Sequence, residues 1–377
     1  MFEQKILTTE DQREWHETLN HFKVKDAYYL PEYLEIYEQE KGKAPFISFG
    51  GQGLLFYFGD SRNAVLYPFF KRSISNLSLG DENLKDIYDI ISPYGYGGPL
   101  AIVENSANLE KLWRNYFLNF HIYCQNNRIV SEFCRLNPFF ENEEPVSKYS
   151  NGTIKRVGQI VYVDLTVSED RILAQMLKGH RRKIRKTESN PDLTFVTNMP
   201  DNGPKIFFDI YTENMLRIGA QGKYLFSPHF FETAFQSLEK NLKFWQIYYR
   251  GDPCAVWTIL TGKDLAYTWL SGSKTQYMNL NPNNMLTHKS ILELKKEGFQ
   301  HLIMGSGKST SRDSLFDFKE GFSPLKKDFY VYKNVHLPQE YNRLVELQNC
   351  KGLGNEEFFP KYRLREEMAG QTSEKEK

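Results

Sequence analysis

The stretch LKFWQIYYRGDPCAVWTILTGKDLAYTWLS, residues 242–271, decides the fold. It contains three runs rich in aromatic and β-branched residues, at 242–250, 254–261 and 265–271, and such residues favour strands. The two turns between the runs are short, and each contains Gly and Asp, which suits tight connections. The sequence therefore predicts a meander of three antiparallel strands.

Further elements are predicted on both sides of this meander. Apolar residues at helical spacing predict helices before it, at about 204–219 and 227–239, and one after it, at about 284–297. Strands at 300–304 and 328–332 follow. The second half of the chain is thus predicted to combine helices, a meander, a helix and further strands.

The first half repeats this order without a visible repeat of residues. Its predicted elements are two helices, three short strands, a helix and a strand, at 9–20, 31–41, 46–49, 53–58, 63–70, 109–124 and 128–136. The polar stretch 137–158 is predicted to be a linker between domains. We therefore expect two α/β units side by side, each with its own sheet, and a cleft between them. One continuous sheet would contradict this layout.

Composition excludes several classes of protein. The 377 residues include 48 Lys and Arg against 47 Asp and Glu, so no overall basic field attracts nucleic acid. The N-terminus, MFEQKILTTEDQREW, lacks the apolar core of a signal peptide, and no apolar run is long enough to span a membrane. The 4 cysteines and 8 histidines are scattered, which gives no support for a metal site. We expect a cytoplasmic protein without a metal or bound cofactor.

A basic helix is predicted over KGHRRKIRK, residues 178–186. At 100° per residue, four of its cations share one face: Lys178, Arg181, Arg182 and Arg185. His180 falls on the opposite, apolar face, where a packed histidine is the simpler interpretation. A solvated surface explains many such runs of charge. Four cations without an interleaved acid also suit a phosphate partner, from a nucleotide or an RNA backbone.

Two further stretches could line a site. SPYGYGGP (92–99) places Tyr94 and Tyr96 among glycines that allow close approach to a ligand, although many such loops only cover the surface. DSLFDFKEGFSP (313–324) carries Lys319 among phenylalanines. This lysine fits either the end of a strand, with its ammonium reaching water, or a desolvated charge that stabilises an oxyanion or binds phosphate.

Two stretches are similar to nucleotide-binding motifs but lack residues that those motifs require. HLIMGSGKSTS (301–311) has Leu302 where a phosphate-binding loop requires its first glycine. RIGAQG (217–222) is similar to the pyrophosphate loop of acetyl-CoA-dependent acetyltransferases, but it follows a helix and has Ala220 in place of a glycine. The loop in the position that such a motif needs, 272–284, has no pair of glycines. The sequence thus argues against CoA as donor.

Four stretches, in their order, resemble the Fem family (FemABX) of aminoacyltransferases that form peptidoglycan bridges, and related acyltransferase-like proteins with tandem GNAT folds. They are IISPYGYGGP (90–99), GHRRKIRKTE (179–188), the YTENM helix leading to GKYLFSP (222–228), and LFDFKEGF (315–322). The resemblance spans about residues 20–335 and implies an α+β fold with mixed α/β sheets: two GNAT-like (acyl-CoA N-acyltransferase fold) domains packed side by side. We expect an N-terminal domain over 1–150, a C-terminal domain over 151–335, a closing helical segment over 336–364 and a disordered tail over 365–377.

The resemblance also implies an activity: transfer of an amino acid from aminoacyl-tRNA, or another activated acyl donor, to an amine of a peptidoglycan precursor. No cofactor is implied, and a lipid-linked substrate would bring the enzyme to the membrane surface. Lys319 matches the family lysine near the reacting centre, and the backbone carbonyl of Phe318 would orient the amine. The other implied substrate-binding residues are Tyr94, Tyr96 and Tyr224 in the cleft, Lys223 beside them, and Lys178, Arg181, Arg182 and Arg185 on phosphates.

Other functions stay open at this point. The turn after the helix at 204–219 reads GAQGKYLF, with Lys223 as its single cation, where Fem proteins often carry several arginines. That difference leaves room for an amino sugar of a surface polysaccharide as acceptor, with acyl-CoA or an acyl carrier protein as donor. A non-catalytic tandem GNAT protein that binds a nucleotide-sugar or RNA is the third alternative.

Overall fold

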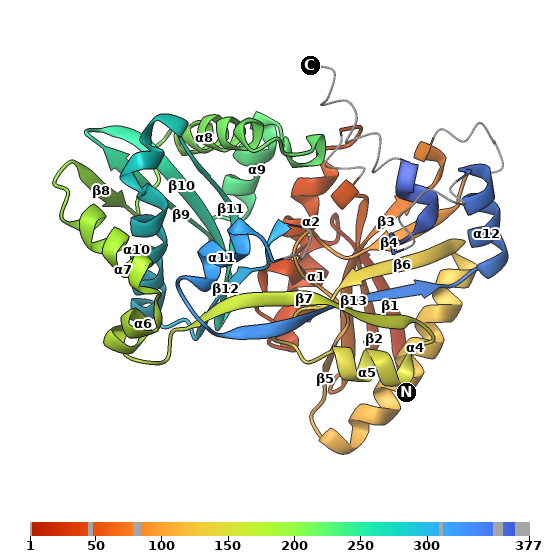
Figure 1. Cartoon of the computed structure of the whole chain (residues 1–377). Coiled ribbons are helices and arrows are strands. Elements are labelled where there is room, and N and C mark those ends of the chain that lie inside the picture. Colours follow the sequence, from red (N-terminus) through yellow and green to blue (C-terminus); the bar gives the residue numbers. More distant parts are fainter. Residues whose placement is uncertain (1, 44–47, 78–83, 309–311, 350–356, 366–377) are drawn as a thin grey trace.

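The computed structural model of the chain describes residues 2–43, 48–77, 84–308, 312–349 and 357–365, and Figure 1 shows its two halves side by side. The elements of the first half are β1 (Glu3–Thr8), α1 (Gln12–His21), α2 (Pro31–Glu38), β2 (Gln52–Gly59), β3 (Ala64–Ser73), β4 (Tyr88–Ile91), β5 (Leu100–Ile102), α4 (Leu109–Asn126), β6 (Ile129–Arg135), α5 (Glu143–Tyr149) and β7 (Thr153–Asp164).

The second half contains a similar series after two inserted helices. Its elements are α6 (Glu169–Gln175), α7 (Lys178–Glu188), β8 (Leu193–Val196), α8 (Gly203–Arg217), α9 (Pro228–Ser237), β9 (Leu242–Tyr249), β10 (Asp252–Thr261), β11 (Leu265–Ser273), α10 (Pro282–Lys296), β12 (His301–Gly305), α11 (Ser314–Glu320), β13 (Lys326–Val335) and α12 (Pro338–Leu347).

The strands of the described residues form one continuous sheet in the order β1-β2-β3-β4-β6-β13-β7-β12-β11-β10-β9-β8, with β5 paired to β3 beside this path. The order is symmetric about its centre. From one edge, β1, β2, β3 and β4 pair antiparallel in turn, and β4 then pairs in parallel with β6. From the other edge, β8, β9, β10 and β11 pair antiparallel in turn, and β11 then pairs in parallel with β12. The two halves therefore share one topology, as expected for two GNAT-like domains.

When the boundary is placed after β7, at Asp164 instead of the expected residue 150, the last strand of each half is exchanged. β6 is followed along the chain by α5 and β7, but its hydrogen-bonded neighbour is β13, with Val331 opposite Arg135. In the same way β12 precedes β13 but pairs with β7, where His301 lies opposite Asp164. β7 and β13 pair with each other between them and cross the molecule in Figure 1. The prediction of two separate sheets is therefore wrong, because these two long strands belong to both halves.

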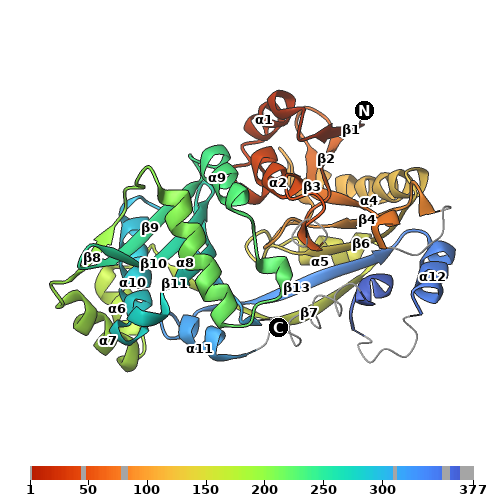
Figure 2. The ribbon, with the colours of Figure 1, turned by 90° about the horizontal axis from the view of Figure 1, so that it is seen from above.

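The helices cover both faces of the sheet. α1, α2, α8 and α9 pack on one face and contribute to a single large core that contains Trp15 and Tyr29 from the first half and Phe207 and Phe231 from the second. α2 lies beside α9 in the view of Figure 2, and Ser227 before α9 donates a 2.5 Å hydrogen bond to the buried Glu40. α4 with α5, and α6 with α7 and α10, cover separate cores on the other face.

Several local predictions are wrong for identifiable reasons. The polar stretch 137–158 is not a linker, since it forms α5 and the start of β7, whose exposed positions hide the strand pattern. Of the strand predicted at 46–49, only residues 48 and 49 are described, and both are helical. The third strand of the first meander is β4 instead. Of the two interpretations of 313–324, the strand end is wrong, because Ser314–Glu320 form the helix α11.

Two further observations concern the surface and the end of the chain. Within the described part of the chain, no helix combines the length and the apolar character needed to cross a membrane. α12 and the short helical turn Lys361–Arg363 return to the first half and pack beside β6, in a core with Ile74 and Val130. Of the tail expected to be disordered, residues 366–377 lie outside the described residues.

Candidate active site

Lys319 lies where the two halves meet. It belongs to α11, whose start is capped by the Asp313 side chain, which accepts hydrogen bonds from the backbone amides of Leu315 and Phe316. Near the other end of this helix, the Lys319 amine donates a 2.6 Å hydrogen bond to the carbonyl of Ser306, just beyond β12. The lysine is thus held against the end of a central strand.

A glycine at the end of β12 leaves space beside the lysine. Gly305 has a φ of +82°, which favours glycine, and a Cβ built there would lie 3.4 Å from Lys319 Nζ and 3.5 Å from the Tyr96 hydroxyl oxygen. The two polar atoms therefore flank one point, although Tyr96 comes from the first half and Lys319 from the second.

Burial makes the charged form of the Lys319 amine less stable. Burial lowers the pKa of its ammonium from 10.5 to about 8, while the carboxylate of Asp313 acts in the opposite direction. The whole side chain is only partly buried by surface area, but its amine is the desolvated end. An ammonium in such a setting interacts strongly with a nearby negative charge, because little water screens it.

Phe318 is held by a histidine of the basic helix. His180 Nε2 lies 3.1 Å from the Phe318 carbonyl oxygen, and since a carbonyl only accepts, this nitrogen carries the hydrogen. The imidazole also packs edge-on against Phe322 at 4.7 Å between ring centroids. The Phe318 carbonyl, expected to orient an amine, therefore already accepts one hydrogen bond, and its second lone pair is what an amine could use.

The basic helix α7 begins beside α11. The Leu177 amide donates a 2.9 Å hydrogen bond to the Gly321 carbonyl, so the two helices are tied end to end. Three predicted phosphate ligands on α7 are exposed, and Arg181 is partly buried with an unpartnered, buried Nε. Among the described residues, no carboxylate forms an ion pair with these four cations, which are Lys178, Arg181, Arg182 and Arg185.

The remaining predicted residues form a second group. Tyr94 lies 6.4 Å from Tyr224 between ring centroids, and both rings contact Phe49. The Lys223 amine lies 5.6 Å above the Tyr224 ring and 5.9 Å from that of Phe49. The structure therefore brings Tyr94, Tyr224 and Lys223 together, with Tyr96 two residues further along the same loop.

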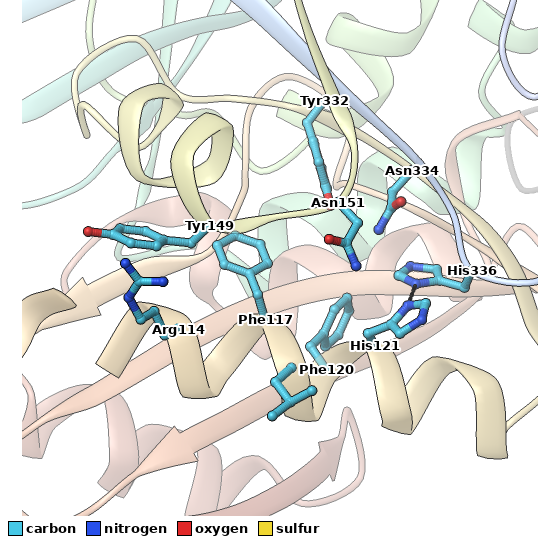
Figure 3. A pocket seen from close by; sticks show the side chains of 10 residues that line it. Arg114, Phe117, Phe120, His121, Tyr149, Asn151, Tyr332, Asn334 and His336 are labelled. Carbon is cyan, nitrogen blue, oxygen red and sulfur yellow. Dashed lines mark hydrogen bonds between the residues drawn. The ribbon is translucent and has the colours of Figure 1, made fainter. Parts of the chain in front are cut away.

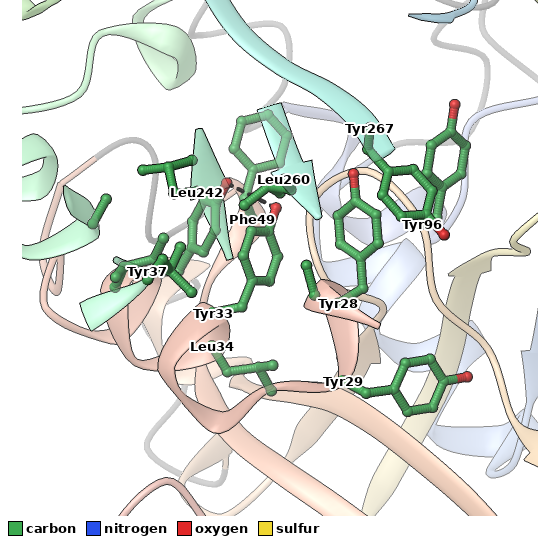
Figure 4. Packing of buried hydrophobic residues seen from close by; sticks show 14 of the residues in the cluster. Tyr28, Tyr29, Tyr33, Leu34, Tyr37, Phe49, Tyr96, Leu242, Leu260 and Tyr267 are labelled. Atoms are coloured by element: carbon green, nitrogen blue, oxygen red, sulfur yellow. Dashed lines mark hydrogen bonds between the residues drawn. The ribbon is translucent and has the colours of Figure 1, made fainter. Parts of the chain in front are cut away.

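Buried tyrosines connect the two groups (Figure 4). The rings of Tyr28 and Tyr96 are 5.7 Å apart, and the rings of Tyr33 and Tyr37 continue the cluster to Tyr94. Tyr33 also donates a 2.5 Å hydrogen bond to the Tyr94 carbonyl. Burial raises the pKa of these phenols well above 10, so they stay protonated and act as hydrogen-bond donors.

Sequence reasoning missed the parts of the site that depend on tertiary contact. It treated His180 as a packed residue, which is correct, but did not connect it to Phe318. It also missed the helix that carries Lys319, although Asp313 followed by Ser and an apolar pair is a recognisable start signal for a helix. Nothing in the sequence pointed to Ser306 as the acceptor of the lysine hydrogen bond.

Comparison with known proteins agrees with this fold. Residues 174–320 match the family model described as an acetyltransferase (GNAT) domain. The structure is similar to that of FemX, with a TM-score of 0.62 at 9% identity, over 90% of this chain and 99% of FemX. No curated protein sequence matches the chain.

Two further solved structures have the same fold. The C-terminal domain of a putative lysylphosphatidylglycerol synthetase from Agrobacterium fabrum gives a TM-score of 0.54 at 12% identity, over 90% of this chain and 97% of that domain. L-PGS from Bacillus licheniformis gives 0.51 at 17% identity, over 80% and 91% of the two chains. The chain thus has the fold of FemX, with a GNAT domain in its second half.

Proposed function

We propose that the protein is an acyltransferase that forms an amide on an amine of a cell-wall acceptor similar to a peptidoglycan precursor, with aminoacyl-tRNA as donor. The observation that carries this proposal is the desolvated amine of Lys319, placed beside the Tyr96 hydroxyl at the end of β12. The fold shared with FemX and the GNAT match over 174–320 support an acyl transfer reaction at this place.

In the proposed reaction the amine of the acceptor attacks the ester carbonyl of the aminoacyl group. A C–N bond forms, the carbonyl oxygen gains negative charge, and collapse of the tetrahedral species breaks the C–O bond of the ester. The amine loses one proton and the departing oxygen gains one, so no external reagent is needed. The Lys319 ammonium would stabilise the negative oxygen, and the Tyr96 hydroxyl would donate a hydrogen bond to it.

The other predicted residues would bind the two substrates. Tyr94, Tyr224 and Lys223 would line the acceptor side, while the unpaired cations at the start of α7 would contact phosphates of the tRNA end or of the precursor. Phe318 would use the free lone pair of its carbonyl to orient the attacking amine. A lipid-linked acceptor, consistent with the lysylphosphatidylglycerol synthetase name of one structural neighbour, would bring the enzyme to a membrane surface.

A second candidate is N-acyl transfer from acyl-CoA or an acyl carrier protein to an amino sugar. It is favoured by the GNAT match over residues 174–320. The lack of a glycine pair in 272–284 speaks against CoA. Calorimetry with acetyl-CoA separates the two, because saturable micromolar binding would favour this candidate.

The deciding experiment is transfer of labelled amino acid from charged tRNA to peptidoglycan precursor by wild-type protein, Lys319→Ala and a control, Lys296→Ala. Lys296 is an exposed residue of α10, so its loss leaves the site intact. We expect Lys319→Ala to lower the rate by about a hundredfold or more, as for loss of one oxyanion-stabilising group. Absence of transfer by the wild type to any amine acceptor contradicts the proposal, and loss of affinity alone in Lys319→Ala indicates a binding protein.

A further inference from the structure

A cavity of about 230 Å³ lies in the first half, between α4, α5 and the end of β13 (Figure 3). None of the residues assigned above to catalysis or substrate binding lines it. Its walls combine aromatic rings with polar groups: Arg114, Phe117, Leu118, Phe120, His121, Tyr149, Asn151, Tyr332, Asn334 and His336. A cavity of this kind suits a small ligand with a flat apolar part and a polar end.

Two histidines and a glutamate form a hydrogen-bonded row at one end. His336 Nε2 lies 3.3 Å from a carboxylate oxygen of Glu132, and both side chains are almost fully buried. The carboxylate only accepts, so Nε2 carries the hydrogen and the other ring nitrogen, Nδ1, accepts when the ring is neutral. His121 Nδ1, which is 3.0 Å from it, then donates. His121 is left with Nε2 as its free nitrogen.

Three further polar side chains at the cavity have no partner. The Tyr332 hydroxyl is buried and makes no hydrogen bond of normal geometry, although the Ser150 side chain is near. The amides of Asn151 and Asn334 form no hydrogen bond with any other described side chain or backbone group, and Figure 3 shows them next to the histidine pair. Tyr332 and Asn334 are buried, whereas Asn151 is exposed, so the unpartnered Tyr332 hydroxyl is the group that most needs a bound molecule as its partner.

The charges around the cavity favour an anion. The Arg114 guanidinium lies 5.2 Å from the Tyr149 ring and donates hydrogen bonds of 3.1 Å and 2.8 Å to Glu110. Glu132 is behind His336, and no described carboxylate lines the cavity itself. A carboxylate ligand at the histidine end would therefore meet two amides and an imidazole, while Arg114, which is paired with Glu110, lies beside Tyr149 at the other end of the cavity (Figure 3).

We propose that this cavity is a second binding site, and that its ligand is a small aromatic carboxylate. The aromatic ring of the ligand would lie against Phe117, Phe120 and Tyr149, and its carboxylate would accept hydrogen bonds from the Asn151 and Asn334 amides and the Tyr332 hydroxyl. His121 would take up a proton on binding, so that Nδ1–H still donates to His336 and Nε2–H donates to the ligand.

This arrangement gives binding a definite dependence on pH. Without a ligand, burial and the neighbouring His336 lower the pKa of His121, so the ring is neutral. The negative charge of a bound anion favours the protonated ring and raises this pKa. His336, with Glu132 behind it, faces His121 directly, Asn151, Asn334 and Tyr332 lie toward this end of the cavity, and Arg114 with Tyr149 lies at the other end (Figure 3). Affinity for the carboxylate is therefore expected to rise as the pH falls from 8 to 6.

The test is calorimetric titration of the full chain with benzoate, with neutral benzamide, and with inorganic phosphate. We expect saturable binding of benzoate, about tenfold or more weaker binding of benzamide, and no matching affinity for phosphate. His121→Gln and Tyr332→Phe should each weaken benzoate binding by about tenfold, while Asn115→Ala, on the same helix but outside the cavity, and Lys319→Ala should not change it.

Each other outcome contradicts the proposal. Absence of benzoate binding at millimolar concentration removes the site. Equal affinities for phosphate and benzoate would show that the site binds anions in general and does not select an aromatic ligand. Benzoate binding that His121→Gln and Tyr332→Phe leave unchanged is located elsewhere. Thermal unfolding of the two variants checks that they are folded, and ligand-detected NMR on the wild type measures binding without any substitution.

Discussion

The hydroxyl of Tyr267 donates a 2.6 Å hydrogen bond to the carboxylate of Asp26, and this contact joins the two halves of the chain. Tyr267 is on β11 in the second half, and Asp26 precedes α2 in the first. The same phenol oxygen accepts a 2.9 Å hydrogen bond from the Asn137 amide. Asp26 is 5% exposed, and no described cation pairs with it, so this hydrogen-bond network takes the place of a salt bridge.

The first prediction concerns the pH dependence of stability. Burial raises the pKa of Asp26 from 3.8 to about 6 in the folded protein, so the folded state binds more protons than the unfolded state between these values. The free energy of unfolding is therefore expected to fall as the pH rises from 4 to 6, by on the order of 2 kcal/mol from this group.

Asp26→Asn should remove that part of the slope, since the amide does not titrate. Urea unfolding of wild type and variant at pH 4, 5, 6 and 7 measures it. Asp264→Asn is a suitable control, because Asp264 is a partly exposed acid on a turn of the second half. Equal slopes in wild type and Asp26→Asn would show that Asp26 does not carry a raised pKa.

The second prediction concerns the pH dependence of transfer. If the Lys319 ammonium stabilises the developing oxyanion, the rate constant at saturating substrate should fall as the pH rises through about 8, where this amine loses its proton. Lys319→Arg keeps its charge at every pH used, so its lower rate should be nearly independent of this ionisation. A rate that rises through the same pH range would instead indicate that the neutral amine acts as a base.

The third prediction concerns the contact between Gly321 and His180. A Cβ added at Gly321 would lie 2.2 Å from a carbon of the His180 ring, too close for either to stay in place. Gly321→Ala is expected to lower the free energy of unfolding by about 1–3 kcal/mol, as in other overpacked sites. Because the ring also donates to Phe318, the same variant should reduce transfer.

A double-mutant cycle checks the cause. In a His180→Ala background the ring is absent, so the added methyl group at position 321 should cost much less than in the wild type. Chemical unfolding of the four proteins gives the coupling energy. If the two substitutions add without coupling, the close contact does not explain the effect of Gly321→Ala.

The fourth prediction concerns the C-terminal segment. Asp89 is fully buried and binds two guanidinium groups, those of Arg72 at 2.8 Å and Arg363 at 2.5 Å, and the two cations hold its pKa below 3.8. Arg363→Ala should cost roughly 3 kcal/mol or more, because it leaves buried charge incompletely paired. Thermal unfolding measures the loss, and Arg365→Ala, a neighbouring residue that binds only backbone carbonyls in the described structure, should cost clearly less.

Elements with strong local periodicity could be predicted from the sequence, and those fixed by distant contacts could not. The meander β9 to β11 and the amphipathic helix α4 have alternating or helical apolar patterns, and both are where they were expected. β7 has few fully buried positions over its first half, because its two faces are only partly covered there. Its polar appearance made it resemble a linker.

The same distinction applies to the candidate site. The types of side chain in SPYGYGGP and LFDFKEGF indicated a place for Tyr96 and Lys319 near a ligand, and the structure brings them to one point. Their proximity depends on the pairing of β12 with β7, which joins residues more than a hundred positions apart. No local pattern encodes such a pairing, so the lysine environment could only be seen in the folded chain.

The exchange of β7 and β13 limits how the chain can be divided. Each half completes its sheet with a strand encoded in the other, so a polypeptide made from either half alone would present an unpaired edge in the middle of its structure. A deletion of one half would therefore also leave the other half without a strand of its sheet. Separately produced halves, divided after β7, are expected to regain the native form only when they are mixed.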